Sequence, residues 1–280
     1  MTPAARFRIG DVVVGVERRD GGLPLARPAY GPFRVEREDA PPDVAVTALP
    51  GPPPPVSGTL RFRSDETWSL WEAGDGFLFR PAEGPGTAWI SETFREVRVY
   101  GLDPEAPVLD YPLDELLFVH LLPDLGGVLL HASAVVQGGR ALGFTGVSGT
   151  GKSTMATLWA SARSAPVLSD DRVVLRVRED AVWCHGTPWH GTAGRALGGG
   201  APLGALHLLT QSRVPYRRPP DPDTALARLL PCVFLPHWDP VRTAWALEAL
   251  HQIVTRIPPE EVGFFPHPAC LDTLFPREAA

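Results

Sequence analysis

Cysteine is scarce in this sequence and forms no metal-binding or disulfide pattern. The three cysteines, Cys184, Cys232 and Cys270, lie far apart, and no CxxC pair occurs. A disulfide framework usually needs an even number of cysteines, and a cysteine-bound zinc needs paired thiolates. The sequence therefore argues against both, and it indicates a reducing compartment.

Long apolar runs and a basic charge excess are also missing. The longest apolar stretch, residues 116–136, is interrupted by His120, Pro123, Asp124 and His131, and so is too broken to cross a bilayer. No apolar segment follows the N-terminal arginines as it would in a secretory signal. The formal net charge of −6 gives no sign of a nucleic-acid-binding face. We expect a soluble, cytoplasmic protein with neither a nucleic acid nor a membrane as partner.

Lysine is almost absent, and asparagine is absent altogether. Of the 26 basic residues, Lys152 is the single lysine, so the others are arginine. Arginine serves well in surface ion pairs, but it cannot replace a compact ammonium that must fit inside a loop of backbone amides. The position at which lysine is retained is therefore itself evidence of a specific role.

The N-terminal part of the chain is predicted to be a β-rich domain spanning residues 1–112. Short segments with alternating β-branched or aromatic residues are separated by turns rich in glycine, proline and aspartate. Trp68, Trp71, Phe77 and Phe79 alternate within these segments, which favours core positions over a binding face. The predicted strands are 7–17, 58–62, 68–71, 76–80 and 96–100.

The remaining residues, 113–280, show an alternation of strand and helix patterns. We expect helices at 114–122, 152–162 and from Pro240 onward, the last with an apolar stripe of Val241, Ala244, Leu247, Leu250 and Val254. The predicted strands are 128–136, 141–144, 166–168, 173–178, 181–185 and 204–210. This pattern predicts an α/β domain.

A phosphate-binding motif follows the strand predicted at 141–144. Residues 146–153 match GxxxxGK[ST] at every fixed position, and the motif opens the predicted helix at 152. Glycines let successive N–H groups point inward, and the helix N-terminus adds partial positive charge. Lys152 would reach the β- and γ-phosphates, and Ser153 would bind Mg²⁺. The full ATP-binding set is Gly146, Val147, Ser148, Gly149, Thr150, Gly151, Lys152, Ser153 and Thr154.

Two adjacent carboxylates and one histidine are the further candidates for catalysis. Asp170 and Asp171 end the short strand after the phosphate loop, where a metal ligand and a general base are needed. The sequence does not divide these roles between them, and a solvated strand end is the alternative. His131 lies on the strand before the loop strand, where an ordinary core histidine is the alternative to a catalytic one.

Together, Leu130-His-Ala-Ser133, the phosphate loop and Leu168-Ser-Asp-Asp171 resemble the catalytic domain of HPr kinase/phosphorylase and, more distantly, the core of phosphoenolpyruvate carboxykinase. The resemblance covers roughly residues 113 to 257. It implies an α/β P-loop kinase core of the HPr kinase C-terminal domain type, a mixed sheet with helices, preceded by the β-rich domain. It also implies that His131 lies near the transferred phosphate and that Asp170 and Asp171 share the base and metal roles. A homo-oligomer would fit this family.

The segment 185–191 departs from the family pattern. HPr kinases carry Glu-Ile-Arg-Gly-Leu-Gly here, whereas this chain reads His-Gly-Thr-Pro-Trp-His-Gly, so neither phosphorolysis nor HPr as substrate is implied. The chain is more similar to HPr-kinase-related proteins of peptide-tailoring systems, including lasso-peptide precursor kinases. Candidate substrate contacts are His185, Thr187, Trp189, His190 and Arg213. For the segment 185–191, the alternatives are a packed structural turn and a metal site formed by its two histidines.

These observations predict an ATP- and Mg²⁺-dependent kinase that phosphorylates a serine of a peptide or small protein. A small-molecule kinase or carboxykinase-like enzyme is the alternative within the same chemistry. A nucleotide-gated binding module is the alternative of another class, because it needs the phosphate loop but no general base.

Overall fold

The computed structural model describes residues 4–36, 40–56, 58–65, 67–84 and 86–276, and the chain divides into two compact units. Unit 1 comprises Met1–Leu121 with Pro236–Pro240, and unit 2 comprises Leu122–Leu235 with Val241–Ala280. The division falls inside helix α1 (Leu113–Asp124), whereas the sequence placed the boundary just before this helix.

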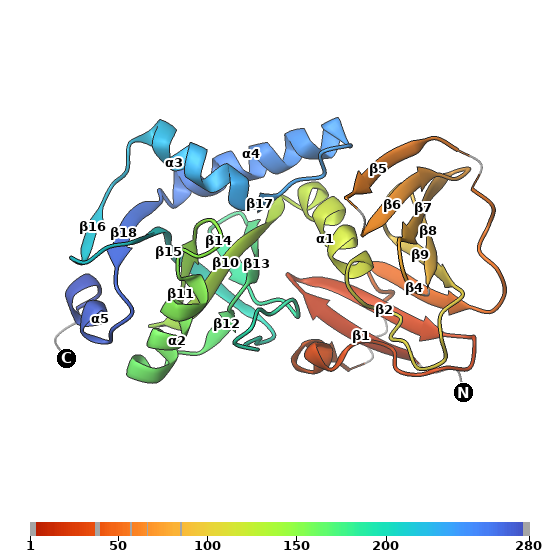
Figure 1. The fold of residues 1–280 in the computed structure, drawn as a ribbon, viewed down its shortest axis with the longest axis horizontal. Coiled ribbons are helices and arrows are strands. Elements are labelled where there is room, and N and C mark those ends of the chain that lie inside the picture. Colours follow the sequence, from red (N-terminus) through yellow and green to blue (C-terminus); the bar gives the residue numbers. More distant parts are fainter. Residues whose placement is uncertain (1–3, 37–39, 57, 66, 85, 277–280) are drawn as a thin grey trace. The chain divides into compact units, whose positions relative to one another are not determined.

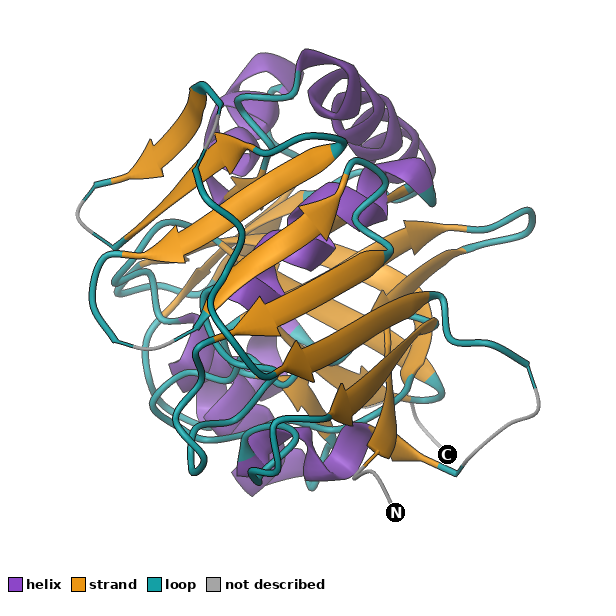
Figure 2. Cartoon of the chain, turned by 90° about the vertical axis from the view of Figure 1, so that its right-hand side faces the viewer, coloured by secondary structure: helices purple, strands orange, loops and turns teal. Residues whose placement is uncertain are grey.

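Unit 1 consists mainly of strands that lie side by side in one sheet (Figure 2). Within the described residues the sheet has nine strands, in the order β3-β1-β2-β4-β9-β8-β7-β6-β5. A 3-10 helix, η1 (Pro28–Phe33), precedes the third strand. The strands are β1 (Ala4–Ile9), β2 (Val12–Arg18), β3 (Arg34–Val35), β4 (Val44–Leu49), β5 (Leu60–Ser64), β6 (Trp68–Glu72), β7 (Gly76–Pro81), β8 (Thr87–Ser91) and β9 (Glu96–Tyr100).

The single strand predicted at 7–17 is a hairpin. Gly10 and Asp11 both have positive φ, 56° and 61°, as the two-residue turn between antiparallel strands requires, and β1 and β2 pair across it. The later segment Pro236–Pro240 belongs to unit 1 because the Trp238 ring lies 5.0 Å from the Phe77 ring and 4.9 Å from the His120 ring.

Unit 2 is built around a closed barrel of five strands, as the strand pairings show. In Figure 1 these strands, β10, β11, β13, β14 and β15, are labelled close together. β10 pairs antiparallel with β11 and β13, β13 with β14, and β14 with β15, and a parallel pairing of β11 with β15 closes the ring. The elements are β10 (Gly127–Gln137), β11 (Arg140–Thr145), α2 (Lys152–Arg163), β12 (Val167–Ser169), β13 (Arg172–Val177), β14 (Val182–His185), β15 (Gly200–Gln211), β16 (Tyr216–Arg218), α3 (Pro222–Leu229), η2 (Leu230–Cys232), β17 (Val233–Phe234), α4 (Pro240–Arg256), β18 (Glu260–Phe264) and α5 (Ala269–Leu274).

The predicted fold class, an α/β P-loop kinase core of the HPr kinase C-terminal domain type, is wrong. The chain is mostly β, with a large mixed sheet in unit 1 and a closed five-stranded barrel in unit 2. Among the described strands of the barrel, only β11 and β15 pair in parallel. Antiparallel neighbours such as β10 and β11, or β13 and β14, are joined by short turns. Local sequence patterns indicate where strands and helices form, whereas the pairing of strands depends on residues that are far apart in the sequence.

Helices α2 and α4 of unit 2 form close to their predicted positions, whereas α3 and α5 were not predicted. Packing confirms Leu250 of the predicted α4 stripe as buried but otherwise selects different residues. The buried residues of α4 are Ala246, Ala249, Leu250 and Ile253, which join the barrel core. Val241 and Leu247, predicted to be part of the apolar stripe, are 55% and 41% exposed. In the described ranges of the chain, no helix combines the length and the apolar character needed to cross a membrane.

Candidate functional site

The phosphate-loop motif adopts a strand–loop–helix conformation. β11 ends at Thr145, and α2 begins at Lys152. Gly146, Gly149 and Gly151 have φ values of 152°, 81° and 100°, in the region where side chains other than glycine are strained. The N-cap residue Gly151 has no side chain to satisfy the first N–H groups of α2. A helix N-terminus of this kind is suited to binding an anion.

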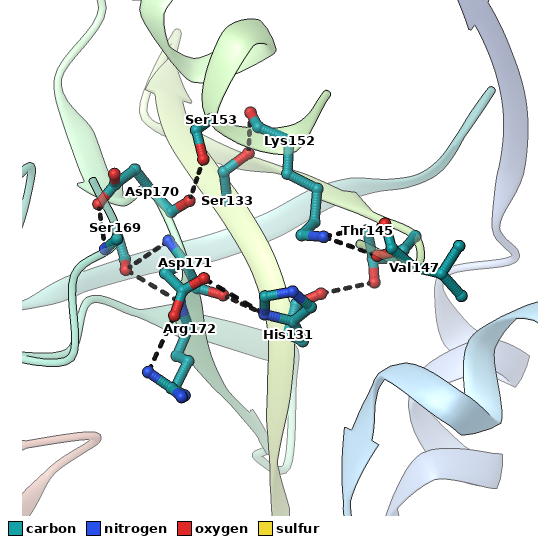
Figure 3. A network of polar contacts seen from close by, with 12 residues as sticks. His131, Ser133, Thr145, Val147, Lys152, Ser153, Ser169, Asp170, Asp171 and Arg172 are labelled. Carbon is teal, nitrogen blue, oxygen red and sulfur yellow. Dashed lines mark hydrogen bonds and ion pairs between the residues drawn. The ribbon is translucent and has the colours of Figure 1, made fainter. Parts of the chain in front are cut away.

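The Lys152 ammonium is held at this loop (Figure 3). Nζ donates to the carbonyl oxygens of Gly146, at 2.8 Å, and Val147, at 3.2 Å. Because an ammonium has three donors, one remains for a phosphate oxygen. The side chain is 6% exposed, and this burial lowers its pKa from the usual value. Lys152 therefore places a desolvated positive charge against the first two residues of the loop, Gly146 and Val147.

Serine hydroxyls fix the start of α2 against neighbouring strands (Figure 3). Ser133 Oγ on β10 donates to the Lys152 carbonyl oxygen at 2.8 Å, and Ser153 Oγ donates to the Asp170 carbonyl oxygen at 3.1 Å. Thr145 Oγ1 donates to the His131 carbonyl oxygen at 2.9 Å. These bonds bring the loop, His131 and the acidic pair to one place.

The Asp170 carboxylate is fully buried and binds backbone amides. Oδ1 accepts from the N–H groups of Gly191, at 3.0 Å, and Arg195, at 3.3 Å, while Oδ2 accepts from that of Ala193 at 2.9 Å. Asp170 thereby organises the turn that follows β14, and its oxygens already have partners.

Asp171 has a different environment, since its side chain is 22% exposed and faces other charged groups (Figure 3). Oδ1 lies 3.4 Å from His131 Nδ1, and Oδ2 lies 2.9 Å from an Arg172 guanidinium nitrogen. The Ser169 hydroxyl accepts from the N–H groups of Asp171 and Arg172, which fixes the turn between β12 and β13. Of the two predicted acids, Asp171 is the one that remains accessible.

His131 is oriented by the backbone of Asp171. Its Nδ1 lies 3.0 Å from the Asp171 carbonyl oxygen, which can only accept, so Nδ1 carries the proton and Nε2 the lone pair. Burial lowers the pKa of His131, the positive charge of Lys152 lowers it further, and Asp171 opposes this shift. The neutral imidazole is therefore favoured beside the phosphate loop.

Most of the candidate substrate contacts are buried. His185, Thr187 and Trp189 are at most 3% exposed, and Thr187 Oγ1 donates to the Arg172 carbonyl oxygen at 2.7 Å. His190 is exposed. Arg213 is also exposed and makes no ion pair with any described residue. The structure thus brings His131 and Asp171 to the phosphate loop and packs the greater part of the 185–191 segment inside unit 2.

The oxygen donors at this site suit Mg²⁺ better than a transition metal. No group of three or more histidine, cysteine, aspartate or glutamate side chains that would hold a metal occurs among the described residues. Mg²⁺ needs no such cage, because it is commonly held by one or two protein oxygens together with phosphates and water. The Ser153 hydroxyl and the Asp171 carboxylate offer oxygens of this type beside the loop.

Models of known protein families give no match to this chain, and a comparison with curated proteins gives no significant relative. The assignment of a function therefore rests on the chemistry and geometry of the site.

Sequence reasoning missed two residues that border the site. Arg172 pairs with Asp171 and lies 5.4 Å from the Phe234 ring centre. Gln211 Nε2 donates to the Gly149 carbonyl oxygen at 2.8 Å and so supports the tip of the phosphate loop. The position of Arg172 directly after the acidic pair was a usable signal, whereas no local pattern indicated Gln211.

Proposed function

We propose that this protein is an ATP- and Mg²⁺-dependent phosphotransferase whose acceptor is a serine hydroxyl of a peptide or small protein. The observation that carries the proposal is the glycine-rich loop at the N-terminus of α2 with the buried Lys152 ammonium turned into it. This arrangement supplies backbone donors, helix-dipole charge and a fixed ammonium for the β- and γ-phosphates.

The acceptor is activated on the side of the loop that holds Asp171. Its carboxylate is accessible, and Arg172 and His131 orient it, so we assign Asp171 the removal of the hydroxyl proton. Neutral His131 turns its Nδ1–H toward Asp171 and adds no charge of its own near the transferred phosphate. Mg²⁺, which Ser153 would hold together with phosphate oxygens, supplies neutralisation of the phosphate charge.

Asp170 has a positioning role in this proposal. Its carboxylate ties down Gly191, Ala193 and Arg195, and its carbonyl oxygen accepts from Ser153. The same residue thus connects the phosphate loop with the turn after β14. The resemblance of the motifs to HPr-kinase-related peptide kinases supports serine as the acceptor. Three free, buried cysteines are compatible with our proposal of a cytoplasmic location.

The test is incubation with Mg-ATP and an acceptor panel, read by intact-mass spectrometry. The panel holds serine-containing precursor peptides, an HPr-like protein and hydroxylated metabolites. We expect a peptide to gain one phosphate, and K152A to abolish the gain. S153A and S161A form a matched pair, because both serines lie on α2 but Ser161 bonds only to carbonyl oxygens of its own helix. S153A should lower the rate by at least about tenfold, and S161A should leave it unchanged.

Phosphate appearing only on a metabolite would replace the peptide with a small-molecule acceptor. Nucleotide binding without any transfer would contradict the kinase and favour a nucleotide-gated binding module. The Ser153–Asp170 connection to the turn after β14 favours that second function, since it links the phosphate loop to a surface segment. In that case D171N would retain ATP-dependent partner binding.

A further inference from the structure

A hollow of about 330 Å³ lies beside the phosphate loop in unit 2. Gln211–Arg213 and Phe264–Pro266 form its walls, and Gly151 and Thr154 border it from the start of α2. Its volume is at the lower end of the range for small-molecule sites, about 300–1,000 Å³. None of its residues takes part in the proposed proton transfer.

Strand register explains why this hollow stands next to the loop. β11, β15 and β18 run parallel, so their C-terminal ends lie at the same edge. Thr145, the last residue of β11, pairs with Leu208, and β15 then continues to Gln211, which pairs with Phe264. At about 3.3 Å per residue, β15 and β18 extend roughly 10 Å beyond the end of β11. They form a wall alongside the phosphate loop.

This wall is bonded to the loop. Gln211 Nε2 donates to the Gly149 carbonyl oxygen at 2.8 Å, and the Ser212 N–H donates to the Phe264 carbonyl oxygen at 2.8 Å. A Cβ placed on Gly151 would lie 2.6 Å from the Phe264 ring, so the loop and the end of β18 are in close contact. The hollow therefore adjoins the loop in which the phosphates of a ligand would lie.

The chemistry of the walls suits a nucleoside. Phe265 is half-buried and Pro266 exposed, which gives an aromatic and an aliphatic surface for a flat base. Arg213 is exposed, is free of ion pairs with described residues, and supplies positive charge at the rim. The lining residues include no carboxylate. A carboxylate is the group that would pair with N1–H and the amino group of guanine, so the walls do not select guanine in this way.

We propose that this hollow is the nucleoside site of the protein, in which the base stacks on Phe265 and Arg213 contacts the ribose and phosphate end. Because stacking does not read the hydrogen-bonding edge of a base, adenine and guanine nucleotides bind within about tenfold of each other. This inference rests on the proposed function, since it assumes that the phosphates occupy the loop.

The first experiment compares the binding of Mg-ATP with that of Mg-tripolyphosphate, which lacks a nucleoside, by titration calorimetry. We expect ATP to bind more tightly than tripolyphosphate. The F265A substitution should weaken the affinity for ATP by five- to a hundredfold and leave the affinity for tripolyphosphate unchanged. R213Q should weaken the affinity for ATP by about three- to tenfold, and this effect should become smaller at high salt because salt screens the charge of Arg213. W245A truncates another exposed aromatic residue, on α4, and should change neither affinity.

Phe265 also packs against the core around α2, so F265A can lose stability. F265L retains most of the buried volume without the aromatic face, and it should show the same selective loss at a wild-type melting temperature. Photolabelling of the unmodified protein with 8-azido-ATP needs no variant, and the labelled peptide should contain residues 211–213 or 264–266.

The two proposals fail in different ways. Equal affinity for ATP and tripolyphosphate, or a photolabel elsewhere, would overturn the nucleoside site and leave the phosphate loop in place. If K152A bound both ligands as well as the wild type does, the proposed function would fall and the nucleoside site with it.

Discussion

The substitution D170N separates a positioning role of Asp170 from a chemical one. It changes a buried carboxylate, with acceptor oxygens toward three backbone N–H groups, into an amide with a single acceptor oxygen. If that oxygen continues to serve Gly191 and Arg195, the new NH₂ group faces the N–H of Ala193, donor against donor, at the present 2.9 Å. The turn after β14 then loses one bond and keeps two weaker ones.

The expected cost follows from these bonds. Hydrogen bonds to charged groups contribute about 1.5–3 kcal/mol each, and an unsatisfied buried N–H costs about 1–3 kcal/mol. One lost bond and two weakened ones give a loss of roughly 2–5 kcal/mol in the free energy of unfolding. D171N removes a partly exposed ion pair with Arg172, which contributes about 0–1 kcal/mol. The neighbouring substitutions should thus differ clearly in stability.

The assay is urea denaturation of both variants, together with limited trypsin digestion at Arg195. D170N should unfold at lower urea, and cleavage after Arg195 should be faster if the turn detaches locally. D171N should retain near-wild-type stability and lose phosphotransfer. A D170N variant with wild-type stability and digestion but no transfer would refute the positioning role, because Asp170 would then act on the phosphate, the metal or the acceptor.

Two further predictions concern the phosphate loop and the acid stability of unit 2. G151A should lose about 2–4 kcal/mol in unfolding free energy, because the positive φ of Gly151 and its contact with Phe264 both penalise a Cβ. G149A should lose only about 1 kcal/mol, because a Cβ on Gly149 meets open space. Equal losses for the two variants in urea denaturation would refute the effect of the Phe264 contact. The pKa of Glu260 is lowered to about 2, mainly by His207, whose Nε2 lies 3.5 Å from Oε2, and also by the ion pair with Arg217, so its stabilising contribution is complete above about pH 4.5 and is lost as the pH falls toward 2. The stability difference between wild type and E260Q should therefore shrink on acidification from pH 6 to pH 3, and a difference independent of pH would contradict this assignment.

The phosphate loop is the part of the site that the sequence predicted best, because its conformation depends on local chemistry. Left-handed glycines, a helix that begins at Lys152 and a strand that ends just before Gly146 are encoded within a few consecutive residues. The pairing of strands is encoded differently. That β11 lies beside β15, and so closes a barrel, depends on residues far along the chain, and the predicted α/β core was wrong for this reason.

The two acids illustrate the same limit at the scale of single side chains. Consecutive residues at the end of a strand point in different directions, so sequence alone could not divide the roles of Asp170 and Asp171. The turn after β14, some twenty residues later, covers Asp170 with backbone amides and leaves Asp171 beside His131 and Arg172. Likewise, the sequence placed helix α4 well and Leu250 on its buried face, but the barrel selected Ala246, Ala249 and Ile253 as the other buried residues instead of Val241 and Leu247.

The sequence by itself therefore determined the local elements: the phosphate loop, its lysine, the position of α2 and most strands of unit 2. Backbone preferences and hydrogen bonds within a few residues are sufficient for these. The tertiary structure alone decided which strands pair, which acid remains accessible and where β15 and β18 form a wall beside the loop. Each of these depends on contacts between segments distant in sequence, which no local pattern encodes.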